Sequence, residues 1–530
     1  MIHSTQAAAS SSGDDRLYAT LFHACQITLF VTCCVTSSQA QGPPSAEAPI
    51  PIPISQEQSA SIFMGAVEAH MDYVTEHSHD QIGERTTPMW ISTIDLRTNG
   101  LPTPLIPNSP RWNGTLLSAA GANLYWDQPS ILAAFELSKR TGCKCYSDSA
   151  SAYIRSFLNE CANSNRQSSL DPRCYYDIKL EKLIDTTATI SPCTPYTPAW
   201  ETLWVANTAQ ARQQIQAYIH AQKAAVSTSD SNDTPIGDTS HAGFATLEQG
   251  IESEAALIAS LCWLAQKDPP QKQHLVEQAL SLAKNRMKRR NHKTGLVPTN
   301  IKTSHEGCDT SSLQLGAWAY VLFQATELTG EPQFQSIAKK VLNAWISQGF
   351  NEQQQRYDNR LDCTTGQPTK NKATQITETE VTSNNPPQTS IFNHVNRPAY
   401  QSPLRMAEAC LSLHEATGDQ PSKLAVERWV NMIKQELPAN DGRGAYAEDY
   451  GRAIHFLVRA SNVMKNPTHH TLARDIANEA MEQLYVPKMG MFRSHPGENR
   501  CDSVDGPGFL LLALMYMEGS DPTQHSALQF

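Results

Sequence analysis

The chain has 530 residues, of which 40% are hydrophobic and 18% are charged, and its formal net charge is -10. This apolar content suffices for a folded core and excludes wholesale disorder. The acidic balance argues against a general affinity for nucleic acid. One basic run, at 284–293, indicates cations near a helix C-terminus or, as the alternative, a groove for an acidic polymer.

Residues 1–40 have the features of an export signal. Arg16 is the only lysine or arginine among them, an apolar stretch covers 17–35, and Ser38-Gln39-Ala40 has the small-x-small form of a cleavage site. We therefore predict a cleaved signal peptide and a periplasmic or extracellular location, with an uncleaved anchor as the alternative. No other segment is long and apolar enough to cross a membrane.

The rest of the chain divides by composition into three parts. A proline-rich linker is predicted at 41–60, a helical domain at 61–519 and a C-terminal tail at 520–530. Of the 13 cysteines, ten follow position 40, and some are expected to pair after export. One or two bridges are expected within 143–193, but Cys143 and Cys145 are expected to be too close to pair with each other. No paired C-x-x-C spacing indicates structural zinc.

Helix stops recur along the predicted helical domain. A threonine and a glycine end the helical patterns at 141–142, 329–330 and 417–418, and looser stops lie at 267–269 and 465–467. Glycine just past a helix adopts the left-handed conformation that closes the last turn. A second helical stretch follows each stop, so the units read as five or six antiparallel helical hairpins.

The two helices of each hairpin differ in their hydrophobic pattern. Segments 313–328, 453–463 and 508–517 are apolar almost all round, as expected of helices buried on every side. Their partners carry a single apolar stripe at helical spacing, such as Phe334, Ile337, Val341 and Trp345. An inner ring of buried helices within an outer ring of half-exposed helices explains both patterns. The predicted fold is all-α, a closed (α/α) toroid with long surface loops.

Aromatic and acidic residues occur together in the first half of this domain. Sugar rings stack on aromatic faces and their hydroxyls bond to carboxylates. We therefore predict substrate contacts here, with core packing as the alternative, from Tyr175, Tyr176, Asp177, Glu201 and Trp204. Next along the chain, His241 with Glu248 and Glu252 is a candidate site for a divalent metal such as Ca or Mn. Like-charged neighbours on a solvated helix are the alternative for the two glutamates.

A long polar insertion covers 364–400, with few helical signals. Structureless segments of this length inside a compact fold are often lids or binding loops. Its end carries three residues that we expect near the mouth of the ring: His394, Arg397 and Tyr400. A functionless disordered insertion is the alternative.

The densest cluster of ionisable residues precedes and opens the apolar helix at 453–463. Arg452 follows Glu448 at i+4 and His455 follows at i+7, which places all three on one face of the helix. Asp449, a further catalytic candidate, and Tyr446, a predicted substrate contact, lie beside them in the sequence. A capping carboxylate with a plain i,i+4 ion pair is the alternative. A later glycine-flanked loop carries Arg493 and His495, and loops on rigid scaffolds often carry function.

Several catalytic motifs are absent from the sequence. It contains no H-E-x-x-H, no G-x-x-x-x-G-K-[ST], no G-x-S-x-G and no G-x-G-x-x-G after a strand. These absences exclude the common zinc-protease, P-loop, α/β-hydrolase and dinucleotide-binding signatures.

The run 294–508 resembles the six-hairpin, or (α/α)-toroid, glycosidase superfamily, which includes glycoside hydrolases and polysaccharide lyases. The stretches GRGAYAEDYGRAIHFLVRA at 442–460 and MGMFRSHPGE at 489–498 are similar to those of exported proteins from polysaccharide-degrading bacteria. The resemblance implies toroidal pectate lyases as the nearest characterised relatives. These use a basic residue and a divalent metal held by histidines and a glutamate, and that set of metal ligands is not evident in this sequence.

Two mechanisms fit these residues, and the number of histidines and arginines slightly favours a lyase. In β-elimination from a uronate, a basic side chain removes a proton made acidic by a neutralised carboxylate; the candidates are Arg452, His455, Arg493 and His495. In hydrolysis, two carboxylates flank the bond; the candidates are Glu448 or Asp449 with Asp177 or Glu201. A non-catalytic sugar-binding protein remains an alternative. A sugar-nucleotide or acylaminosugar epimerase is another, but the export signal disfavours it because its nucleotide or sugar pool is cytosolic. The predicted partner is a polysaccharide or oligosaccharide, and the lyase hypothesis predicts one that is rich in uronic acids.

Overall fold

The structure is a computed structural model, and it describes residues 56–81, 84–101, 121–163, 174–185, 198–228, 251–299, 308–369, 402–437 and 444–519. The chain divides into Met1–Pro53 and Ile54–Phe530, and every described residue belongs to the second unit. The predicted signal peptide and C-terminal tail lie outside the described residues. Among the residues described, no helix has both the length and the hydropathy of a membrane span.

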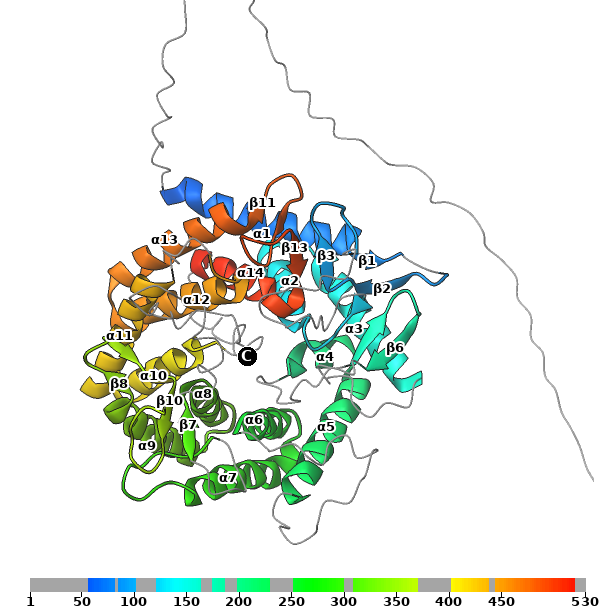
Figure 1. Ribbon diagram of the computed structural model, residues 1–530. Helices are drawn as coiled ribbons and strands as arrows, with labels where there is room; N and C mark the ends of the chain where they lie inside the picture. Colours follow the sequence, from blue (N-terminus) through cyan, green and yellow to red (C-terminus); the bar gives the residue numbers. More distant parts are fainter. Residues whose placement is uncertain are drawn as a thin grey trace, which may run out of the picture. The chain divides into compact units, whose positions relative to one another are not determined.

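Fourteen α-helices in the described residues form two concentric rings within Ile54–Phe530 (Figure 1). The inner ring consists of α2 (Gln128–Thr141), α4 (Trp200–Ala206), α6 (Ile251–Lys267), α8 (Ser312–Thr329), α10 (Leu404–Thr417), α12 (Ala447–Met464) and α14 (Pro507–Glu518). The outer ring consists of α1 (Gln56–His77), α3 (Cys145–Asn163), α5 (Thr208–Thr228), α7 (Lys272–Lys288), α9 (Pro332–Gln348), α11 (Gln420–Glu436) and α13 (Pro467–Leu484). The predicted (α/α) toroid is confirmed.

Six hairpins join consecutive helices, from α2–α3 to α12–α13, which is the upper of the two predicted counts. A seventh pair forms between the first helix, α1, and the last, α14. The inner ring closes because α2 packs on α14, and because α4 meets α6 through the Trp200 Nε1 to Ser260 Oγ hydrogen bond of 2.9 Å. Helix α1 begins at Gln56, within the segment predicted as a linker at 41–60.

The predicted hydrophobic patterns account for the two rings. All but the last residue of α14 are buried, whereas α9 buries the stripe that includes Phe334, Val341 and Trp345. The predicted stops are confirmed: Gly142, Gly330 and Gly418 follow α2, α8 and α10 with φ of 75°, 78° and 65°. Each donates its N–H to a carbonyl of the last helical turn, which satisfies an acceptor that the helix end leaves open.

Short antiparallel ribbons lie between outer helices and the inner helices that follow them. The paired strands are β1 (His79–Asp80) with β2 (Thr87–Trp90), β3 (Thr93–Asp95) with β13 (Arg500–Asp502), β7 (Asp309–Ser311) with β10 (Arg360–Asp362), β8 (Phe350–Asn351) with β9 (Arg356–Tyr357), and β11 (Tyr485–Val486) with β12 (Met491–Phe492). A three-stranded sheet contains β4 (Gly121–Ala122), β5 (Cys174–Asp177) and β6 (Lys182–Asp185). The β3–β13 pair joins the beginning of this unit to its end.

Neighbouring inner helices begin side by side, except that the short α4 begins beside the middle of α6, where Trp200 meets Ser260. Contacts join their first turns: Glu252 in α6 with Gln314 in α8, and Gly316 in α8 with Met406 in α10. The first turns of α12, α14 and α2 meet in the same way. We call this end of the ring the N-terminal face. Long connections lead into the inner helices here, whereas only short turns join each inner helix to its outer partner at the other end.

A disulfide joins Cys143 and Cys145 in the turn between α2 and α3, a pairing that the sequence was expected to exclude. That expectation was wrong because the two Cα atoms lie 5.4 Å apart, within the ordinary span of a disulfide.

Substituting Gly451 tests whether close packing of inner helices sets the geometry of the N-terminal face. A Cβ at this residue of α12 would lie 2.5 Å from the backbone carbonyl carbon of Phe509 in α14. We expect Gly451→Ala to lower the free energy of unfolding by about 1–3 kcal/mol, because overpacking outweighs the better helix propensity of alanine.

The measurement is the urea unfolding midpoint of purified protein. Gly65→Ala in α1 is the matched control, since a Cβ there meets nothing within 4 Å. The control should gain up to about 1 kcal/mol from helix propensity. Equal midpoints for the two variants would contradict this account of the packing.

Candidate active site

Buried charged residues gather in the first turns of the inner helices at the N-terminal face. Isolated charges are rarely buried, because removing them from water is costly unless partners compensate. The carboxyl of Glu448 is fully buried in the first turn of α12, and Arg452 Nε donates to Glu448 Oε1 at 2.8 Å. The Arg452 guanidinium lies 4.1 Å from the ring centroid of Phe509 in α14. The predicted i,i+4 geometry is therefore present, as a buried ion pair, and Asp449 is buried beside it.

Arg405, in the first turn of α10, was missed by sequence reasoning because no charged or aromatic cluster surrounds it in the sequence. It is 6% exposed, and its Nε and Nη2 have no hydrogen-bond partner among the described residues. Burial and the neighbouring Arg452 lower the pKa of Arg405 to about 9, although Glu448 and Glu252 act in the opposite direction. Groups on two neighbouring inner helices, α6 and α12, thus influence this guanidinium, and two of its donor nitrogens have no acceptor among the described residues.

Glu252 lies in the first turn of α6, is 3% exposed and accepts a 3.3 Å hydrogen bond from Gln314 Nε2. Burial raises its pKa to about 7, against the opposing effects of Gln314 and Arg405. It is not one of two solvated glutamates, so that alternative is wrong for Glu252. Its predicted metal-site partners, His241 and Glu248, lie outside the described residues. Among the described residues, no three His, Cys, Asp or Glu side chains form a metal-binding group.

His455 lies two turns deeper in α12 and joins this helix to α10. Its Nδ1 is 2.8 Å from Glu408 Oε1, and its Nε2 has no hydrogen-bond partner within the described part of the chain. Arg459 Nη1 donates to the other carboxylate oxygen of Glu408 at 2.7 Å. Burial acts to raise the pKa of Glu408, but His455 and Arg459 outweigh it and the pKa falls to about 2. This network fixes the orientation of His455 beside the ring of Tyr516, at 4.8 Å between centroids.

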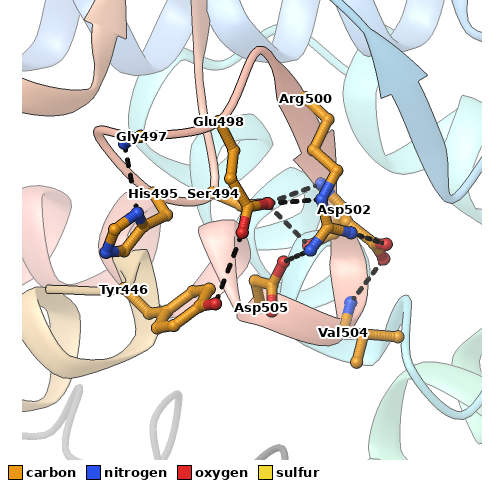
Figure 2. Close-up of polar contacts among 9 residues, drawn as sticks. All are labelled: Tyr446, Ser494, His495, Gly497, Glu498, Arg500, Asp502, Val504 and Asp505. Atoms are coloured by element: carbon orange, nitrogen blue, oxygen red, sulfur yellow. Dashed lines mark hydrogen bonds and ion pairs between the residues drawn. The ribbon is translucent and has the colours of Figure 1, made fainter. Parts of the chain in front are cut away.

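A second charged cluster surrounds Arg500 in β13 (Figure 2). This buried guanidinium forms ion pairs with three carboxylates, those of Glu498, Asp502 and Asp505. Burial raises the pKa of Glu498, and repulsion from the two aspartates adds to this effect against the attraction of Arg500. The ion pairs of Arg500 with these three carboxylates join residues along the segment that leads into α14.

Two predicted site residues adjoin the Arg500 cluster (Figure 2). The hydroxyl of Tyr446 lies 3.4 Å from Glu498 Oε1, and the ring of Tyr446 lies 4.7 Å from that of His495. The structure therefore brings Tyr446 and His495 together. Arg493 Nη1 donates to the carbonyl of Pro496 in the same loop at 3.4 Å.

The other predicted contacts are distributed more widely. Tyr175, Tyr176 and Asp177 lie in β5 between β4 and β6, and Asp177 Oδ1 accepts hydrogen bonds from the N–H groups of Lys179 and Leu180. Glu201 is exposed and pairs with Lys267 at 2.7 Å, and Trp204 packs edge-on against Trp263. Both partners belong to the C-terminal half of α6, so the structure does not bring Glu201 to Glu448. His394, Arg397 and Tyr400 lie outside the described residues.

Comparisons with known proteins find distant structural relatives. No family model and no curated protein matches the chain. A D-mannose isomerase aligns with 10% identity and a TM-score of 0.46, over 88% of this chain and 99% of the isomerase. Cellobiose 2-epimerase from Bacillus thermoamylovorans B4167 aligns with 10% identity and a TM-score of 0.43, over 87% of this chain and 100% of the epimerase. The GH76A alpha-1,6-mannanase from Salegentibacter sp. HEL1_6 aligns with 11% identity and a TM-score of 0.43, over 87% of this chain and 100% of the mannanase. Likeness at this level carries no argument about chemistry, which has to come from the side chains.

Proposed function

We propose that the protein is an exported enzyme that cleaves glycosidic bonds of an acidic polysaccharide at the N-terminal face of its inner ring. The observation that carries the proposal is Arg405, a buried guanidinium with two donor nitrogens unpartnered among the described residues. A second guanidinium, Arg452, and a buried carboxyl of raised pKa, Glu252, influence its charge from neighbouring helices.

The substrate class follows from this arrangement of charge. A buried donor without an acceptor destabilises the free protein, and a carboxylate or sulfate ligand would supply the acceptor. The first turns of the inner helices also direct N–H groups and positive partial charge toward this face. Both features favour an anionic ligand. The uronate residues of a polysaccharide carry such a carboxylate on a sugar ring. Sugar rings are also the substrates expected from the resemblance to (α/α)-toroid glycosidases.

Hydrolysis is the chemistry that the carboxyl groups support best. The environments of Glu252 and Glu448 differ: burial raises the pKa of the first, whereas the second is held in an ion pair with Arg452. A protonated carboxylic acid beside an ionised carboxylate is the pattern of glycosidases, in which one donates the proton to the leaving oxygen. We assign the acid to Glu252 and the carboxylate to Glu448. This pair replaces the sequence-based partners Asp177 and Glu201.

Uronate β-elimination is the second candidate, and Arg405 is the observation that favours it. A guanidinium bound to the substrate carboxylate would make the adjacent C–H more acidic. Glu252, with a pKa of about 7, would then accept that proton near neutral pH. This route uses the same substrate as hydrolysis and shares Glu252 with it, but it does not need Glu448, and it leaves a different product.

The test is incubation of the purified full chain with polygalacturonate, alginate and hyaluronan, and with carboxyl-reduced neutral forms of each. Hydrolysis should yield new reducing ends without ultraviolet absorbance, and elimination should yield reducing ends together with the absorbance of an unsaturated uronate. Cleavage should require the carboxylates of the substrate, so the carboxyl-reduced polymers should not be cleaved. Binding without either product would instead support a sugar-binding protein, and cleavage of only the neutral polymers would contradict the proposed substrate class.

Substituting Arg405 tests its role in recognising the carboxylate. We expect Arg405→Gln to lower kcat/KM for the cleaved uronate polymer by about 10- to 100-fold, as for loss of a hydrogen bond to a charged group. Arg360→Gln is the control, because Arg360 is 48% exposed and pairs only at the surface with Asp309 among the described residues. The control should behave as wild type. Unchanged kcat/KM in Arg405→Gln would exclude carboxylate recognition by Arg405.

A further inference from the structure

Two cysteines face each other at the end of the β7–β10 ribbon. The register pairs Arg360 with Ser311 and Asp362 with Asp309, so the next pair along the ribbon is Cys363 with Cys308. The Cys363 N–H donates to the Cys308 carbonyl at 2.7 Å, which continues the ladder to this pair. Residues directly opposite in an antiparallel ladder have Cα atoms about 5.5 Å apart and side chains on the same face. That separation lies within the span of a disulfide.

The side chains of the pair also interact. Both are free thiols, Cys308 exposed and Cys363 buried. Burial raises the pKa of Cys363, and the charge of Cys308 and a side-chain hydrogen bond with it act in the same direction. Cys262 and Cys410, by contrast, are single thiols buried within the inner helices α6 and α10. The Cys308–Cys363 pair thus has both its backbone register and its side-chain contact established in the described residues.

We propose that Cys308 and Cys363 form a disulfide under oxidising conditions. With a small-molecule disulfide as oxidant, the exposed Cys308 thiolate attacks one sulfur and expels a thiolate, leaving a mixed disulfide. The Cys363 thiol then loses its proton and attacks Cys308 Sγ, which expels the second thiol of the oxidant. Two protein thiols become one disulfide, and one small disulfide becomes two thiols.

The disulfide would covalently link the two strands of the β7–β10 ribbon at the N-terminal face. Strand β7 leads directly into α8, and β10 is followed by the sequence segment 364–401 that leads to α10 and Arg405. A covalent bond at Cys363 would therefore hold the beginning of that segment beside the start of α8. Closing the loop between residues 308 and 363 would also restrict the unfolded chain, which is how disulfides are thought to stabilise proteins.

The test oxidises the reduced full chain with glutathione disulfide, alkylates the remaining thiols after denaturation, and maps peptides by mass spectrometry without reduction. We expect the peptides containing Cys308 and Cys363 to be linked, and the melting temperature to rise by about 2–6 °C. Cys363→Ser should retain a glutathione adduct on Cys308, and Cys308→Ser should leave Cys363 unmodified. The alkylated Cys410 peptide serves as the internal control.

Recovery of Cys308 and Cys363 as separate alkylated peptides after oxidation would overturn the proposal. Linkage of either residue to a different cysteine would overturn it as well. Both readouts are independent of polysaccharide cleavage, so failure of the disulfide and failure of the proposed function are distinguishable.

Discussion

Glu252→Gln is expected to reduce polysaccharide cleavage by about 10²- to 10⁴-fold, the usual range for removal of a general acid or base. The same substitution is expected to stabilise the fold above pH 7. Burial holds the native-state pKa of Glu252 at about 7, above its ordinary value of 4.5. The native state therefore binds this proton more tightly than the unfolded chain does, and stability is lost as the pH rises between these two values.

The size of the stability effect follows from the pKa difference. Ionisation of Glu252 above pH 7 destabilises the wild-type fold by about 1–3 kcal/mol, allowing for relaxation around the buried group. Glutamine keeps a hydrogen-bonding group for Gln314 and does not ionise, so the difference between variant and wild type should grow from pH 5 to pH 8. Burial also raises the pKa of Asp127 to about 6. Its effect on the pH dependence of stability is the same in the wild type and in Glu252→Gln, so it cancels in the difference between them.

Glu254→Gln is the matched control on the same helix. Glu254 Oε2 pairs with the buried Arg286 at 2.8 Å, and Glu254 Oε1 accepts from Trp318 Nε1. Its substitution should lower stability at pH 8, because it removes the charge opposite a buried guanidinium, and should leave cleavage intact. Urea unfolding at several pH values and initial rates of cleavage measure both effects. An active or less stable Glu252→Gln protein at pH 8 would rule out the assigned role.

Local sequence patterns were sufficient to predict the fold. The helix stops at Gly142, Gly330 and Gly418 and the apolar stripes depend only on residues a few positions apart, and the structure confirms both. The seventh helix pair was not predictable in this way. It joins α1 to α14, which no short connection marks in the sequence.

The candidate site could be predicted only where its contacts are local. The i,i+4 spacing of Glu448 and Arg452 indicated a contact that the structure contains. Arg405 and Glu252 acquire their properties from other inner helices, and closure of the ring brings these together. For the same reason, the aromatic and acidic residues at Glu201 and Trp204 resembled a sugar site, although the ring places them beside the far half of α6. Composition around a residue does not reveal which end of a toroid it occupies.

Arg500→Met is expected to have the largest effect on stability, about 3–5 kcal/mol at neutral pH, because it leaves buried carboxylates without their counter-ion. Arg500 is 1% exposed and is the shared partner of Glu498, Asp502 and Asp505 (Figure 2). Methionine preserves most of the apolar volume of the arginine side chain. The loss should therefore come from charge rather than from a cavity.

The pH dependence separates these two causes. Burial already raises the pKa of Glu498, and Arg500 opposes that effect, so the pKa should rise further in the variant. A raised native-state pKa of a carboxyl favours the fold at low pH, and the deficit of Arg500→Met should shrink from pH 8 to pH 5. Arg97→Met is the control: Arg97 is 66% exposed and pairs with Asp95, the residue opposite Arg500 in the β3–β13 ribbon. The control should unfold at nearly the wild-type urea concentration. A deficit of Arg500→Met that is independent of pH would show that packing, and not the excess of buried carboxylates, makes this residue necessary.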